Sequence, residues 1–195
     1  MTSSRPSTSQ PSRTCLSAVK TDLVQIAFVA TSLVVLAALQ DMLPSGAGGA
    51  KVPFVQVFAL YVALAGPSGL EEKHPRAPRS FRWAWTAAAA GYLMEALSGL
   101  PPFSCIGFMV PVCALAHMLR AIAPSDLAKP VLGMAAAAAY TPLQEAWLAA
   151  WSAGGDSAVV RFFVSLVLAA LAGAALFPVL PAVERFAGLR REEVP

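Results

Sequence analysis

Five long stretches without basic residues and nearly without acidic ones constrain this 195-residue chain more than any other feature. They are Leu23–Gln40, Val52–Leu70, Trp83–Leu119, Pro130–Val160 and Phe162–Val183. A helix that crosses a bilayer needs about 20 consecutive apolar residues. By that measure the third stretch holds two helices and each of the others holds one. With only 13% charged residues, against about 25% in globular proteins, the chain is expected to cross a membrane six times.

The distribution of basic residues predicts how these crossings are oriented. If the N-terminus is cytoplasmic, all of the 14 lysines and arginines except Lys51 and Arg161 fall on the cytoplasmic side. Basic residues are enriched on that side of membrane proteins. The topology therefore has both termini inside, and the net charge of +3 reflects topology rather than binding of nucleic acid. The cytoplasmic basic face includes Arg76, Arg79, Arg82 and Arg120.

The chain divides into three parts on this interpretation. Residues 1–21 are rich in Ser, Thr and Pro and predict a disordered cytoplasmic tail. Residues 22–184 form the transmembrane domain, an all-α compact bundle of six helices. Residues 185–195 form a cytoplasmic C-terminal tail. The expected location is therefore a membrane, which the chain crosses several times.

Six polar residues fall in one layer near the outer ends of the predicted helices. This outer polar layer contains Asp41, Gln56, Glu95, Gln144, Glu145 and Arg161. Glu95 is the only charge between Trp83 and Leu119, and an ionisable group at membrane depth is costly. It should therefore face a wet cavity, an internal partner such as Arg161, or a companion protein. We hypothesise a polar cleft in the outer half of the bundle that is used for binding.

Nothing in the sequence indicates an enzyme. It contains no nucleotide-binding glycine loop, no zinc-protease His pair and no serine-nucleophile motif, and its only histidines are His74 and His117. The three cysteines, Cys15, Cys105 and Cys113, have no metal-site spacing. No cofactor or metal is predicted.

One segment resembles a known family. Gly91, Glu95 and Gly99, followed by Pro101 and Pro102, and then by a helix ending in Arg120, resemble the rod shape-determining protein MreD family. That family shows Gly-x-x-x-Asp-x-x-x-Gly, a turn rich in Pro or Gly, and a helix ending in Arg. The chain departs from the pattern in two places. Glu95 replaces the aspartate, and Phe103 and Ser104 stand where a glycine is common.

The resemblance implies a non-enzymatic membrane component of the cell-elongation machinery that builds peptidoglycan. Its implied partner is MreC, bound through the transmembrane or outer face. The wider complex would include MreB, RodA and the transpeptidase that works with RodA, and the basic loops would face the cytoskeleton and anionic lipid.

Two other classes stay open. Substrate-binding subunits of energy-coupling-factor vitamin importers are also small, six-spanning and similar in architecture, and they bind their ligand from outside. The first predicted helix shows no clear Ala-x-x-x-Ala pair of the kind that those subunits use. A general scaffold or lipid-binding protein also fits the composition, but this class explains neither Glu95 nor the turn that follows it.

Overall fold

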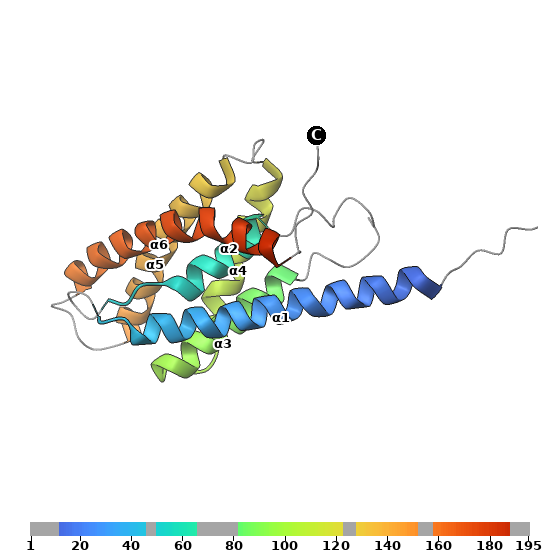
Figure 1. Ribbon diagram of the computed structural model, residues 1–195. Helices are drawn as coiled ribbons and strands as arrows, with labels where there is room; N and C mark the ends of the chain where they lie inside the picture. The colour runs from blue at the N-terminus through green and yellow to red at the C-terminus, as the bar shows by residue number, and fades with distance from the viewer. Residues whose placement is uncertain (1–11, 46–49, 66–81, 123–127, 152–157, 188–195) are drawn as a thin grey trace, which may run out of the picture.

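All regular secondary structure in the described part of the chain is helical. A computed structural model describes residues 12–45, 50–65, 82–122, 128–151 and 158–187, and within these ranges no strand occurs. The helices, shown in Figure 1, are α1 (Ser12–Met42), α2 (Phe54–Ala65), α3 (Arg82–Ser98), α4 (Ile106–Ile122), α5 (Ala128–Trp151) and α6 (Ala158–Phe186).

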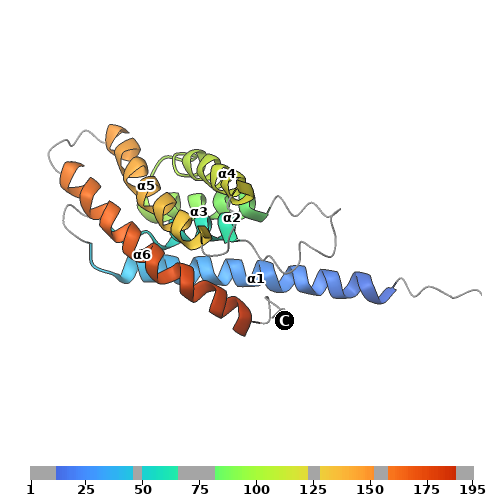
Figure 2. The same ribbon diagram turned by 90° about the horizontal axis from the view of Figure 1, so that it is seen from above.

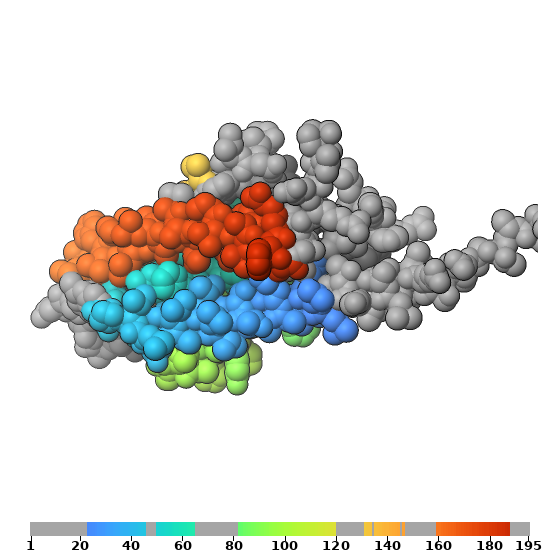
Figure 3. Space-filling model, viewed as in Figure 1, coloured from blue at the N-terminus to red at the C-terminus, as the bar shows by residue number. Residues whose placement is uncertain are grey.

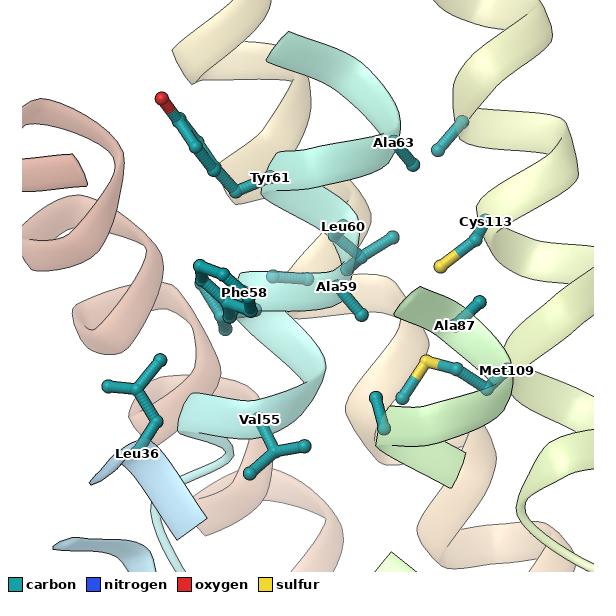
Figure 4. Packing of buried hydrophobic residues seen from close by; sticks show 14 of the residues in the cluster. Leu36, Val55, Phe58, Ala59, Leu60, Tyr61, Ala63, Ala87, Met109 and Cys113 are labelled. Atoms are coloured by element: carbon teal, nitrogen blue, oxygen red, sulfur yellow. The ribbon is translucent and has the colours of Figure 1, made fainter. Parts of the chain in front are cut away.

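Helix α2 is the centre of the fold. It contacts α1, α3, α4, α5 and α6, and its residues Val55, Val57–Tyr61, Ala63 and Leu64 are at most 1% exposed. A helix that is apolar on all sides requires such an environment. Figure 4 shows Val55 and Phe58 toward Leu36 of α1, with Met109 and Cys113 of α4 on another side. Helix α2 is also short, about 18 Å at 1.5 Å per residue, so it is enclosed by longer neighbours.

The remaining helices surround α2 partly as pairs. Helix α3 packs on α4 and α5 packs on α6 (Figure 2). Gln40, near the end of α1, contacts Val55 at the start of α2 and Met94 near the end of α3. At the other end, His117 of α4 stacks on Trp83 with ring centroids 5.5 Å apart. Helix direction therefore alternates along the chain, giving the bundle a Glu95 end and an Arg82 end.

Among the described residues, two helices are long and apolar enough to cross a membrane. They contain Leu23–Met42 and Val159–Phe186, with mean hydropathies of 2.1 and 2.4. Only 28% and 33% of their most apolar windows are buried, so most of this apolar surface faces outward. Helices α1 and α6 cover much of the face shown in Figure 3. Phe54–Leu64 and Ile106–Leu119 are shorter apolar segments.

The described helices extend beyond the predicted transmembrane domain, residues 22–184, mainly at its N-terminal boundary. Helix α1 begins at Ser12, within the segment 1–21 whose composition predicts a disordered tail. Neither Pro nor Gly interrupts Ser12–Met42, and extending an existing helix costs far less than starting one. Helix α6 continues two residues past the predicted boundary, to Phe186. Residues 1–11 and 188–195 lie outside the described part.

Candidate functional site

Glu95 lies in the last turn of α3 and binds the start of α4. Its Oε1 accepts hydrogen bonds from the backbone N–H groups of Cys105 at 2.8 Å and Ile106 at 2.9 Å. Its Oε2 accepts one from the N–H of Phe103 at 3.1 Å. The residue is 6% exposed. The internal partner of Glu95 is thus the backbone of the next helix and not Arg161.

These bonds complete the N-terminus of α4. The first N–H groups of a helix have no partner within it. Glu95 accepts from Ile106, while Gly107 donates to the carbonyl of Phe103 at 3.0 Å and Phe108 to that of Cys105 at 3.3 Å. The partial positive charge at a helix N-terminus also favours a nearby anion. Glu95 therefore acts as a capping residue supplied from the preceding helix.

The two glycines of the motif have separate structural roles. Gly99 has φ of +62°, and Leu100 donates from its N–H to the carbonyl of Glu95 at 3.3 Å, which is the Schellman ending of a helix. Gly91 lies one turn before Glu95, where an added Cβ would lie 2.8 Å from Cα of Ile106. The spacing of four residues therefore produces a close contact between α3 and α4, a cap and a helix stop.

The turn between α3 and α4 contains one strained residue. Ser104 donates from its N–H to the carbonyl of Pro101 at 3.3 Å, with Pro102 and Phe103 between them. Phe103 has φ of +67°. Proline followed by a residue with positive φ is the pattern of a type II turn, in which glycine usually takes the second place. The departure from the family pattern therefore coincides with the strained residue.

We expect Phe103→Gly to stabilise the protein. A left-handed conformation costs an L-residue about 1–2 kcal/mol, and glycine removes this cost. Glycine also loses more backbone entropy on folding, which cancels about 0.5–1 kcal/mol of the stabilisation. The expected net rise in the free energy of unfolding is about 0.5–1 kcal/mol, measured by denaturant titration in detergent micelles. Phe103→Ala is the control, since it removes the ring and keeps Cβ. Equal stability of the two variants would show that Phe103 is not strained.

Gln40 has a role at α2 that parallels the role of Glu95 at α4. Its Oε1 accepts a hydrogen bond from the N–H of Val55 at 3.3 Å, in the first turn of α2. Its Nε2 lies 3.3 Å from Sδ of Met94 as a donor. Gln40 is 6% exposed. Helices α2 and α4 thus both begin with a buried side chain of a preceding helix bound to their free N–H groups.

Gln144 extends the same hydrogen-bonded layer to α5. Its Nε2 donates to Sγ of Cys105 at 3.3 Å, and it is 4% exposed. Cys105 is also one of the three donors to Glu95. Glu95 and Gln144 of the predicted outer polar layer therefore meet at one residue, and both are engaged within the fold.

The structure describes the side chains of three other predicted site residues, Asp41, Gln56 and Arg161. Asp41 forms an exposed ion pair with Lys51 at 2.6 Å. Gln56 is buried in α2, and its Oε1 has no hydrogen-bond partner. Arg161 lies half-buried in the first turn of α6. Glu145 is in α5, but its side chain lies outside the described part.

The basic residues predicted for the cytoplasmic face are described only in part. Arg76 and Arg79, together with the side chain of Arg120, lie outside the described residues. Arg82 is half-buried at the start of α3. It borders a cavity at the Arg82 end of the bundle that the sequence analysis missed. The available signal was Gln25, an amide inside the first apolar stretch.

The arrangement is suited to holding helices together. Among the described residues no group of three His, Cys, Asp or Glu side chains comes close enough to hold a metal ion. Cys105 and Cys113 are buried and carry no disulfide. The carboxylate of Glu95 already accepts three hydrogen bonds, so it has little capacity left for a substrate.

Comparison with known proteins gives no relative. No family model, no curated protein and no solved structure matches the chain.

Proposed function

We propose that the chain is a six-span protein of the bacterial inner membrane that acts by binding other proteins, without catalysis. The main support for insertion in a membrane is the capping of α2 and α4 by Gln40 and Glu95. Inside a bilayer no water is available to free N–H groups, so helix ends at membrane depth need protein partners. Short helices that begin within the bundle, with buried side chains bound to their first N–H groups, meet this requirement.

The outward-facing side chains support the same proposal. Large apolar residues of α1 and α6, such as Leu23, Val34, Phe163 and Leu171, are more than 60% exposed. Soluble monomers rarely expose apolar patches larger than a few hundred Å². In a lipid environment these side chains contact acyl chains and not water, so their exposure is not unfavourable. In the proposal α3 and α4 also span, each about 26 Å long at 1.5 Å per residue, while the shorter α2 crosses inside the bundle, enclosed by its neighbours.

The proposed orientation places the Arg82 end in the cytoplasm. The helix bounds place Arg82, Arg120, Lys129 and Arg185 at that end and place Lys51 and Arg161 at the Glu95 end. This distribution supports cytoplasmic termini, because basic residues concentrate on the inner side. The Glu95 end then faces outward.

For the partner we propose MreC, in a role similar to that of the MreD family. The support is the resemblance of Gly91, Glu95 and Gly99 to the family motif, together with the distinct structural role that each residue has in the α3–α4 hairpin. The hairpin also exposes Tyr92 and Leu97 toward its outer end, at 66% and 47%. In this proposal MreC binds that outer apolar surface, and the complex brings it together with MreB, RodA and the transpeptidase.

The importer alternative receives less support from the geometry. A vitamin-binding subunit needs a site open to the outside. Here Glu95 and Gln144 bind groups of the fold itself, while the cavity bordered by Arg82 lies at the opposite end. We therefore keep the partner-binding role.

Co-purification tests this role. The full chain is co-expressed with MreC of the same bacterium, extracted in mild detergent and captured by an affinity tag. We expect MreC in the eluate, and we expect Leu97→Gln to lower its recovery at least fivefold. Leu115→Gln is the control. Leu115 is 58% exposed, but it lies in the C-terminal half of α4, toward the Arg82 end. Capture of a vitamin-like small ligand without MreC would contradict the proposal.

A further inference from the structure

A cavity of about 240 Å³ lies between α1, α2, α3 and α6 at the Arg82 end of the bundle. Val29 and Leu33 of α1 and Ala89 of α3 form part of its apolar wall. Trp85 borders it and is 74% exposed, and Ile26 is 66% exposed. The cavity therefore opens sideways, onto the apolar surface that the proposed function places in lipid.

Gln25 gives this cavity a polar element that the fold does not use. The residue lines the cavity and is only 6% exposed. Neither its Nε2 nor its Oε1 has a hydrogen-bond partner. A buried amide without partners costs about 1–3 kcal/mol, so a ligand that offers both a donor and an acceptor would recover that loss.

The polar and apolar residues of the cavity are separated along the helix axes. Gln25 lies toward the N-terminal end of the apolar part of α1, Arg82 is the first residue of α3, and Glu184 is near the end of α6. Leu33 and Ala89 lie roughly 10–12 Å further into the bundle at 1.5 Å per residue. One end of the cavity is thus polar, with one charge of each sign, and the rest is apolar. This separation of polar and apolar residues matches an amphiphile whose polar head lies at the cytoplasmic surface of the membrane.

The volume limits what can enter. A dry apolar cavity of about 150 Å³ is known to take a benzene molecule. At about 240 Å³ the present cavity accepts a segment of one hydrocarbon chain and excludes most of a two-chain lipid. The second chain would stay in the bilayer, next to the exposed side chains of Ile26 and Trp85.

We propose that this cavity binds one acyl chain of a zwitterionic phospholipid, phosphatidylethanolamine, with its head region at Gln25. The lipid ester carbonyls accept from Nε2 of Gln25, and the ammonium group donates to Oε1 of Gln25. The phosphate faces the positive charge of Arg82. The inference rests on the membrane insertion proposed above, but not on the identity of the protein partner.

Native mass spectrometry of the full chain in detergent, titrated with dioleoyl-phosphatidylethanolamine, tests the site. We expect one tightly bound lipid per chain, with dioleoyl-phosphatidylcholine at least threefold weaker because its head has no N–H donor. Ala89→Phe places a ring at the cavity wall and should weaken binding at least fivefold. Ala96→Phe, at an exposed position of the same helix away from the cavity, should leave it unchanged. Gln25→Leu should keep the lipid and lose the preference for ethanolamine.

The outcomes separate this proposal from membrane insertion itself. Release of the chain from membranes by alkaline carbonate would overturn the insertion, and the lipid site with it. A chain that resists carbonate but binds the lipid equally well with Ala89→Phe and Ala96→Phe would overturn the lipid site alone. An unchanged preference for ethanolamine in Gln25→Leu would overturn the role assigned to Gln25.

Discussion

Replacing Glu95 with alanine is expected to lower the free energy of unfolding by about 3–5 kcal/mol, because each buried donor left without a partner costs about 1–3 kcal/mol. Three N–H groups lose their acceptor, those of Phe103, Cys105 and Ile106. The lower part of the summed range applies because Cys105 is the only one of these three residues that is fully buried. The measurement is unfolding by sodium dodecyl sulfate in mixed micelles, followed by circular dichroism.

Asp41→Ala is the matched control for this prediction. Asp41 lies at the same end of the bundle as Glu95. Its partner is the side chain of Lys51, and this ion pair is exposed. Such pairs contribute about 0–1 kcal/mol. Glu95→Gln should fall between wild type and Glu95→Ala, since an amide keeps one acceptor oxygen and turns a donor toward other donors. If Glu95→Ala cost no more than Asp41→Ala, the carboxylate would not be a cap.

The second large effect is expected for Gly91→Ala. The added Cβ would lie 2.8 Å from Cα and 2.9 Å from N of Ile106. Backbone atoms cannot rotate away as a flexible side chain can, so α3 and α4 must separate. Overpacking of this kind costs about 1–3 kcal/mol, and we expect about 2–3 kcal/mol here because the displaced N–H of Ile106 also bonds to Glu95.

Gly107→Ala adds the same methyl group where the structure has room. No atom lies within 4 Å of the Cβ position at Gly107. Alanine is favoured over glycine inside a helix by about 0.8–1 kcal/mol, so this variant should be as stable as wild type or more so. Both variants are measured in the same denaturant titration. Similar effects of the two substitutions would show that the close approach of α3 to Ile106 does not exist.

The helical content and the turn after Gly99 could be predicted from the sequence. Long apolar stretches predict helices, and Pro101-Pro102 cannot continue one. The partner of Glu95 could not be predicted in this way. Side-chain caps are recognised from residues at the helix start itself, whereas Glu95 lies eleven residues before Ile106 and reaches it only because α3 folds back onto α4.

The central position of α2 and the fit between helices also depend on three-dimensional packing. Apolar stretches do not show which helix the others surround. Gly133 illustrates the second point, since a Cβ there would collide with the ring of Phe177 on α6. The sequence shows a glycine in an alanine-rich helix, but not the ring that covers it. Gln25 was likewise visible as an amide in an apolar stretch, but not as the lining of a cavity.

We predict a membrane bundle whose Glu95 end is closed by its own backbone, and the reactivity of Cys105 tests this most directly. Cys105 is fully buried within the layer formed by Glu95 and Gln144. With Cys15 and Cys113 replaced by alanine, spheroplasts are treated with a membrane-impermeant maleimide. In a background without native cysteines, Met42→Cys and Phe186→Cys mark the two ends, since both positions are more than 80% exposed.

We predict that Met42→Cys is labelled in intact spheroplasts, that Phe186→Cys is labelled only after permeabilisation, and that Cys105 is labelled only after denaturation. Labelling of Cys105 from outside at the rate of Met42→Cys would contradict the account, because it would show an open cleft at the Glu95 end.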